Sequence, residues 1–230
     1  MNIVITGASR GIGYSTVKVL AQDKQHKIII LTRNIQGLSD KISADPVLKD
    51  ADIVAHYLDL QHFTAADLPK MPDHIDVLIN NAGLLINKPF SQLTEADCSS
   101  MFQTNVMGPA KLIQCLLPQM GQNRPSHIVS IGSMGGFQGS SKFPGLSAYS
   151  ASKAALSVLS ECLAEELKGS HISCNCLCLG AVDTDMLREA FPGYEAPTSS
   201  DEMGRFIAEF ALNGHKYFNG KTLPAAISTP

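Results

Sequence analysis

The sequence lacks any excess of positive charge. Its 18 lysines and arginines are balanced by 21 aspartates and glutamates, for a formal net charge of −3. Because no basic stripe is present, we expect no nucleic-acid partner. The sequence also lacks an apolar run near the roughly 20 residues that a membrane-spanning helix needs, and we expect no membrane partner.

Leader segments, linkers and repeats are missing as well. The first predicted strand begins so early that a signal or transit peptide has no room, which makes the cytoplasm the expected location. Hydrophobic residues make up 44% of the 230 residues and charged residues 17%, as in a well-packed globular chain. We therefore expect one domain, residues 1–230, with a continuous core.

The six cysteines are not expected to form a disulfide framework, because a chain of this size builds its core without one. Cys174, Cys176 and Cys178 alternate along a predicted strand, which places them on one face about 6.6 Å apart. This spacing suits a tetrahedral metal poorly, and no histidine pair accompanies it. We favour buried, reduced thiols over the alternative of a metal site.

Short apolar runs alternate with helical patterns along the chain. Strands are predicted at residues 3–6, 27–32, 52–58, 76–79, 127–131, 173–179 and 222–225. Helices are predicted at residues 13–22, 35–43, 63–68, 95–120 and 147–168. Several strands are apolar throughout, which is typical of a parallel sheet covered on both faces. The order predicts an α/β fold, a Rossmann-like doubly wound parallel sheet.

The stretch TGASRGIG, residues 6–13, joins the first strand to the first helix. Gly7 permits a sharp turn, Gly11 lets backbone approach a ligand, and Gly13 lets the helix pack on the sheet. Backbone N–H groups and the positive helix end then attract an anion, most naturally a dinucleotide pyrophosphate. A plain tight turn is the alternative. The expected cofactor contacts are Gly7, Ser9, Arg10, Gly11, Ile12 and Gly13.

The end of the second strand bears on the choice of nucleotide. NAD-binding proteins carry an acidic residue there for the ribose hydroxyls. This chain instead has Thr32 and Arg33, and no carboxylate before Asp40. Arg10 adds a second guanidinium, and such a pair suits a 2′-phosphate. We expect NADP(H) rather than NAD(H), with two solvated surface arginines as the alternative.

Three polar motifs follow the later strands. Residues 80–83 (NNAG) follow the fourth strand and Ser133 the fifth, while Tyr149 and Lys153 (YSASK) share one helical face. We expect the Lys153 ammonium, the positive helix end and an oxidised nicotinamide to lower the pKa of the Tyr149 phenol. The phenol would then exchange a proton with a carbonyl or alcohol oxygen held by Ser133. A packed tyrosine, a surface lysine and a loop serine are the alternatives.

Together and in this order, TGASRGIG, NNAG, the serine after the fifth strand and YSASK resemble the short-chain dehydrogenase/reductase family. The resemblance covers nearly the whole chain. It implies that Ser133, Tyr149 and Lys153 are catalytic and that Asn105 holds a water in a proton relay to the lysine. An asparagine satisfied inside its helix is the alternative. The expected enzyme is an NADP(H)-dependent carbonyl reductase or alcohol dehydrogenase that acts on a small molecule.

The resemblance also assigns further cofactor contacts and an assembly. Asp59 would meet the adenine amino group, unless it is only a strand-end cap. Residues 179–184 would hold the nicotinamide carboxamide. A homodimer or homotetramer would form through the helices at 95–120 and 147–168. The contacts expected outside the glycine turn are Thr32, Arg33, Asp59, Leu60, Asn81, Ala82, Gly83, Tyr149, Lys153, Gly180, Val182 and Thr184.

The chain departs from the family pattern at three places. Leu179 stands where the family usually has proline, and the C-terminal GKTLPAAISTP lacks the usual acidic Gly-Gly ending. The interval from Ser133 to Tyr149 is 16 positions, longer than usual, and we place the extra residues in GSSKFPG at the substrate mouth. Ser130 and Ser140 are alternative serines, but neither fits the strand end as well.

Apolar residues near the expected substrate pocket favour a substrate with an apolar body, unless they only pack on the domain. They are Met134, Phe137, Phe143, Met186, Leu187, Phe191 and Tyr194. Residues 185–203 resemble a mobile lid, in which Arg188 is expected to face water. Two rival functions are a catalytically silent NADP-binding regulator, which need not keep the serine, tyrosine and lysine together, and a methyltransferase, which does not need the tyrosine and lysine pair.

Overall fold

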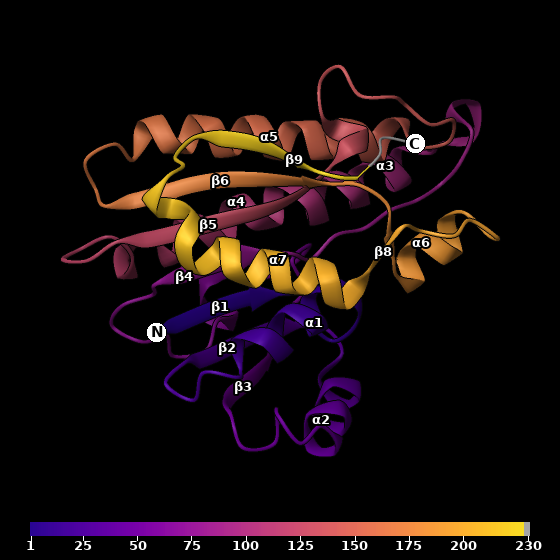
Figure 1. Cartoon of the computed structure of the whole chain (residues 1–230). Helices are drawn as coiled ribbons and strands as arrows, with labels where there is room; N and C mark the ends of the chain where they lie inside the picture. Colours follow the sequence, from indigo (N-terminus) through magenta and orange to yellow (C-terminus); the bar gives the residue numbers. More distant parts are fainter. Residues whose placement is uncertain (228–230) are drawn as a thin grey trace.

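A seven-stranded parallel sheet forms the centre of the molecule in the computed structural model, which describes residues 1–227 (Figure 1). The strand order is β3-β2-β1-β4-β5-β6-β9. The strands are β1 (Asn2–Thr6), β2 (Lys27–Thr32), β3 (Asp52–Tyr57), β4 (Val77–Asn80), β5 (Ser126–Ser133), β6 (Ile172–Leu179) and β9 (Lys221–Ala225). The order reverses between β1 and β4, which is where such sheets bind ligands. The predicted single doubly wound domain is confirmed, and its residues 228–230 lie outside the described residues.

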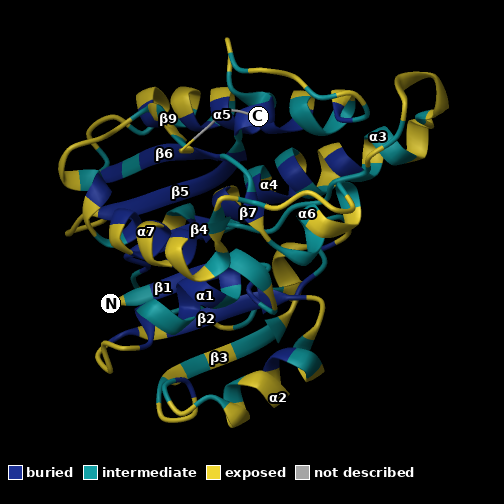
Figure 2. Cartoon of the chain, turned by 45° about the vertical axis from the view of Figure 1, so that its right-hand side comes forward, coloured by how far each residue is buried: buried dark blue, intermediate teal, exposed yellow. Residues whose placement is uncertain are grey.

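Helices cover both faces of this sheet (Figure 1). They are α1 (Gly11–Leu20), α2 (Ile35–Ala44), α3 (Glu95–Phe102), α4 (Gly108–Leu116), α5 (Ser147–Glu166), α6 (Asp185–Ala190) and α7 (Ser200–Asn213). Side chains of α1, α2 and α7 pack on one face of the sheet, and those of α4 and α5 pack on the other. Burial on both faces explains why the central strands are apolar throughout, and these strands are the darkest part of Figure 2.

Two predicted helices differ from the structure. The helix expected at 63–68 is a single 3₁₀ turn (Ala65–Asp67), because the Thr64 and Asp67 side chains and backbones bond each other locally and Pro69 prevents its continuation. The helix expected at 95–120 runs as α3, a π-helical segment (Gln103–Met107), α4 and a 3₁₀ turn (Leu117–Gln119). The π-helical segment carries Asn105, one of the predicted site residues.

The segment predicted as a lid is fixed at both ends. β7 (Val182–Asp183) pairs in parallel with β8 (Thr198–Ser199), and α6 lies between them, standing partly exposed in Figure 2. Residues 200–203 belong to the first turn of α7, where Met203 is buried. A Cβ atom on Gly204 would lie 2.7 Å from Cβ of Ser15, so α7 packs directly on α1. Of the predicted lid, residues 185–197, which lie between β7 and β8, take no part in the packing of α7 on α1.

The three cysteines of β6 are free and fully buried. Cys176 and Cys178 lie under α5, where the Ser157 hydroxyl is 3.3 Å and 3.6 Å from their sulfurs. No group of three metal-ligating side chains occurs within residues 1–227. Over the same range, no helix combines the length and apolar character that crossing a bilayer would need.

Candidate active site

A cleft of about 640 Å³ opens at the carboxyl ends of the central strands. It is lined by the glycine turn after β1, the NNAG segment after β4, the end of β5 and the start of α5. The predicted residues that line it are Gly7, Ser9, Arg10, Gly11, Ile12, Gly13, Thr32, Arg33, Asp59, Leu60, Asn81, Ala82, Gly83, Ser133, Tyr149, Lys153, Gly180, Val182 and Thr184. Asn105 is the one predicted site residue that does not line it.

The glycine turn has the geometry that its sequence predicts. Gly7 and Gly11 have φ angles of +67° and +57°, which favour glycine. A Cβ atom on Gly7 would lie 2.7 Å from Cα of Ala82, so any side chain there would collide with the NNAG segment. The Arg10 side chain does not cap α1, which leaves first-turn N–H groups for an anion. These features fit the pyrophosphate of a nicotinamide dinucleotide.

Hydrogen bonds tie the NNAG segment to the glycine turn. The Asn81 side-chain amide donates to the carbonyl oxygens of Thr6 and Gly7, both at 3.0 Å. The Thr6 hydroxyl accepts from the backbone N–H groups of Asn81 at 3.1 Å and Ala82 at 3.0 Å. Thr6 was not predicted as a site residue, although its place at the end of β1 beside the first glycine is a usable signal.

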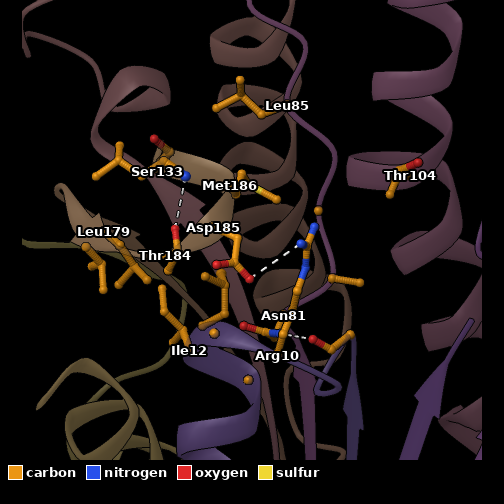
Figure 3. Close-up of a pocket in the computed structure, with 18 of the residues that line it drawn as sticks. Arg10, Ile12, Asn81, Leu85, Thr104, Ser133, Leu179, Thr184, Asp185 and Met186 are labelled. Atoms are coloured by element: carbon orange, nitrogen blue, oxygen red, sulfur yellow. Dashed lines mark hydrogen bonds and ion pairs between the residues drawn. The ribbon is translucent and has the colours of Figure 1, made fainter. Parts of the chain in front are cut away.

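The two arginines predicted to meet a 2′-phosphate differ in their partners. The Arg10 guanidinium lies 3.5 Å from a carboxylate oxygen of Asp185 (Figure 3). It also lies 3.6 Å from a carboxylate oxygen of Glu189, so it joins the glycine turn to α6. Arg33 is exposed and forms no ion pair with residues 1–227. Lys41, which sequence reasoning missed, donates to the Ser9 carbonyl oxygen at 2.9 Å.

Asp59 lies beside Arg33 at the same end of the cleft. Partial burial opposes ionisation of this carboxyl, but three neighbouring groups hold its pKa below the ordinary value. These groups are the Gln61 backbone N–H, the His62 side chain and the positive charge of Arg33. Asp59 is therefore a carboxylate, although its hydrogen bond from Gln61 also makes it a local turn cap, as the sequence alternative stated.

Tyr149 and Lys153 lie one turn apart near the start of α5 and enter the cleft beside Ser133. The buried Lys153 ammonium donates to the Ile131 carbonyl oxygen at 2.7 Å. The Ser133 hydroxyl lies beside the Tyr149 phenol and acts to lower its pKa. A Cβ atom on Gly83 would lie 3.3 Å from the Lys153 nitrogen, so glycine at this position leaves room for the amine.

The protein's own groups do not acidify the Tyr149 phenol. Burial raises its pKa above the ordinary value of 10, and the Ser133 hydroxyl offsets only part of this rise. Burial also lowers the pKa of Lys153 to about 8. For the protein groups alone, loss of hydration raises the Tyr149 pKa, and Lys153 is not among the groups that shift it. The predicted lowering, which includes an oxidised nicotinamide beside the phenol, stays a prediction. Tyr149 is kept protonated, as a proton donor must be.

Asn105 lies behind the cleft wall, fully buried in the π-helical segment. Its side-chain oxygen accepts from the Leu84 backbone N–H at 2.8 Å. Its amide donates to the Leu84 carbonyl oxygen and to the Ser152 hydroxyl, both at 2.9 Å. Asn105 thus fastens the chain after NNAG to α5. No hydrogen bond joins it to Lys153 within the described chain.

Comparison with known proteins agrees with this geometry. The family model described as short chain dehydrogenase matches residues 1–195.

The chain belongs to the short-chain dehydrogenase/reductase family.

Its relatives span several activities. A ketoacyl reductase, HetN, from Nostoc sp. is 31% identical over 211 residues, which cover 86% of this chain and 71% of HetN. The Pseudomonas aeruginosa RhlG structure, an active-site complex with NADP, has a TM-score of 0.83 at 25% identity and covers 98% of this chain and 94% of its own. A Brucella melitensis 3-ketoacyl-(acyl-carrier-protein) reductase complexed with NADH has a TM-score of 0.80 at 21% identity, covering 98% and 96%.

Membership makes the chain an oxidoreductase of CH–OH or C=O groups that uses a nicotinamide cofactor on small molecules. The chain departs from the family pattern at Leu179, where regular backbone pairing continues to the end of β6. Leu179 ends β6 and pairs with Ser133 of β5, and the Gly180 N–H donates to the Ala225 carbonyl oxygen at 3.1 Å. Thr184 caps α6 by accepting from the Leu187 N–H at 3.1 Å.

Ser133 is the serine that faces the cleft of this short-chain dehydrogenase. Ser130 is buried under the helices and its hydroxyl has no partner within residues 1–227. The Ser140 hydroxyl instead bonds to the Met134 and Phe137 carbonyl oxygens within its own loop.

Of the apolar residues predicted around the substrate, six line the cleft: Met134, Phe143, Met186, Leu187, Phe191 and Tyr194. Phe137 does not, because it packs with Cys176 and Cys178 under α5. Sequence reasoning missed Leu85 and Leu146, which also line the cleft.

Proposed function

We propose that this enzyme reduces a carbonyl group of a small molecule, or oxidises the corresponding alcohol, with NADP(H) as the hydride carrier. The observation that carries the proposal is the joint placement of Ser133, Tyr149 and buried Lys153 in the cleft that also contains the glycine turn. When bound there, the nicotinamide ring supplies or accepts the hydride.

Each catalytic side chain has a distinct task. The Ser133 hydroxyl holds the carbonyl oxygen by a hydrogen bond. Tyr149 donates its phenolic proton to that oxygen, and its raised pKa keeps the proton available at neutral pH. The Lys153 ammonium stabilises the phenolate that remains. Asn105 positions the backbone beside this lysine through Leu84 and Ser152, and in the proposed relay it also holds a water.

The preference for NADP(H) rests on charge at the adenosine end. Arg33 is exposed without an ion-pair partner in residues 1–227, and Arg10 also lines the cleft. Thr32 stands where NAD-binding proteins carry an acid. A 2′-phosphate would gain charge-assisted hydrogen bonds from these guanidinium groups.

We also propose that the chain forms a homodimer or homotetramer through the segments at 95–120 and 147–168. Met107 and Val158 on these segments are exposed at 55% and 56%, which is high for apolar side chains and supports a covered surface.

The test is the consumption of NADPH across a panel of carbonyl compounds by the wild type and Tyr149→Phe. Tyr217→Phe is the matched control, because Tyr217 is 80% exposed and lies outside the cleft. We expect only Tyr149→Phe to lose turnover. Equal turnover by Tyr149→Phe would contradict the catalytic assignment. NADPH binding without turnover of any compound would favour the silent regulator.

A further inference from the structure

The substrate end of the cleft is walled by apolar side chains. Leu85, Leu146 and Met186 lie there, together with Phe143 and Phe191. The charged residues that line the cleft are Arg10, Arg33, Asp59, Lys153 and Asp185. Of these, only Lys153 is hydrogen-bonded next to the catalytic serine, at the Ile131 carbonyl oxygen. The wall around the reacting oxygen therefore offers a substrate body apolar contacts and no free charge.

An aromatic pair forms part of this wall. The rings of Phe143 and Phe191 meet edge to face, with centroids 6.3 Å apart and planes at 68°. Phe143 belongs to the long loop between Ser133 and Tyr149, and Phe191 follows α6 directly. Three segments far apart in the sequence thus meet here, because the Asn87 side chain also donates to the carbonyl oxygen of Ala190 in α6 at 2.7 Å.

The cations around this mouth are already engaged. Lys88 lies 2.7 Å from an Asp97 carboxylate oxygen. The Lys142 ammonium donates to the Phe137 carbonyl oxygen at 2.7 Å and also bonds the Ser140 hydroxyl.

Arg188, also near this mouth, is ion-paired with Asp183 and lies 2.7 Å from Asp185. An anionic substrate, or an acidic protein that presents one, would have to displace Asp97 from Lys88, and Asp183 and Asp185 from Arg188. At Lys142 it would compete only with neutral oxygens.

We propose, on the basis of the proposed function, that the substrate is an uncharged carbonyl compound with an aromatic or bulky apolar body, free in solution. A carboxylate on the part of the substrate that contacts Phe143, Phe191 and Leu85 would lose its hydration without gaining a partner. An apolar body gains contact with both rings instead.

A matched pair of ketones tests this substrate class. Methyl 4-acetylbenzoate and 4-acetylbenzoate share one skeleton and differ in the charge at the far end. We expect kcat/KM with NADPH to be about 100-fold higher for the ester, because a buried carboxylate has no partner. Phe143→Ala should lower kcat/KM for the ester about tenfold, mainly through KM, and leave the Kd for NADPH unchanged. Phe206→Ala on α7, outside the cleft, is the control.

Three outcomes separate this inference from the proposed function. Preferred reduction of 4-acetylbenzoate, or of a ketoacyl thioester on an acidic carrier protein, would overturn the substrate class and leave the reductase proposal standing. Equal behaviour of Phe143→Ala and Phe206→Ala would also overturn it. If the ester binds the NADPH complex more tightly than the acid in calorimetry, but is not reduced, the substrate class holds and the proposed reaction fails.

Discussion

The two ends of the cleft are built in different ways. At the cofactor end, Gly7, Gly11 and Asn81 act through backbone conformation and hydrogen bonds to neighbouring strands. At the substrate end, Phe143 and Phe191 act through side-chain contact between segments that lie far apart in the sequence. Backbone geometry admits few residue types, whereas an apolar wall admits many of similar size. The cofactor end therefore identifies the family, and the substrate end is the part that can differ between its members.

Charge divides the two ends in the same way. The cofactor end holds Arg10, Arg33 and Asp59, whereas the cations near the substrate mouth are ion-paired or bonded within their own loop. Tyr149 and Lys153 lie between the two ends. Burial raises the pKa of Tyr149 and lowers that of Lys153, which favours the neutral form of each. Changes at one end should thus alter cofactor binding and changes at the other should alter substrate binding.

Among the variants that distinguish the two ends of the cleft, Gly7→Ala is expected to have the largest effect on cofactor binding. Its Cβ atom would collide with Ala82, and the backbone would have to leave its φ of +67°. We expect the Kd for NADPH to rise by about 100-fold, the loss that displacing a helix-terminus phosphate cradle would cause. Gly169→Ala is the matched control, because Gly169 has a φ of +87° and a Cβ atom there would meet nothing within 4 Å.

Gly169→Ala should lose about 1–2 kcal/mol of unfolding free energy from backbone strain, measured by urea denaturation. Gly7→Ala should lose this amount and more, because its Cβ atom also collides with Ala82. Only Gly7→Ala should lose NADPH. Tight NADPH binding by Gly7→Ala would remove the distinction between the two ends of the cleft.

A smaller effect is expected for the arginines. Arg33→Ala should raise the Kd for NADPH about 10- to 100-fold and change the Kd for NADH little, because a charge-assisted hydrogen bond contributes about 1.5–3 kcal/mol. Arg10→Ala should raise the Kd for NADPH by a smaller factor. Arg10 already pairs with Asp185 and Glu189 and must give up these partners to meet a phosphate. Isothermal titration with both cofactors gives the four ratios. An equal rise in the Kd values for NADPH and NADH in Arg33→Ala would show that Arg33 does not contact a 2′-phosphate.

The smallest effect concerns pH and the residue between the two ends. The Lys153 pKa of about 8 means a cation below that pH and a neutral amine above it. In the proposed mechanism the cation stabilises the Tyr149 phenolate left after proton donation, so kcat for reduction should fall about tenfold as pH rises through about 8.

Lys153→Arg should remove this fall, because a guanidinium stays charged over the whole range. Lys49→Arg, on the surface, should keep it. The same fall in Lys153→Arg would assign the titration to another group.

The sequence was sufficient for the parts of the site that are local. The glycine turn, NNAG and the tyrosine and lysine pair each occupy a few consecutive positions at strand or helix ends, so the αβ pattern alone brings them to one edge. The π-helical segment that carries Asn105 was not predictable, because its residues also suit an α-helix. The contact of Phe143 with Phe191 and the pKa of Tyr149 depend on how distant segments pack, and no short motif encodes that.

One measurement tests the central claim, that Tyr149 gives its proton to a carbonyl oxygen at the junction of the two ends. It is the single-turnover rate of oxidation of enzyme-bound NADPH by methyl 4-acetylbenzoate, in the wild type and in Tyr149→Phe, with the NADPH Kd determined on the same samples. The predicted result is a rate constant about 1,000-fold lower in Tyr149→Phe, with an unchanged Kd. Equal rate constants for the two proteins would contradict it.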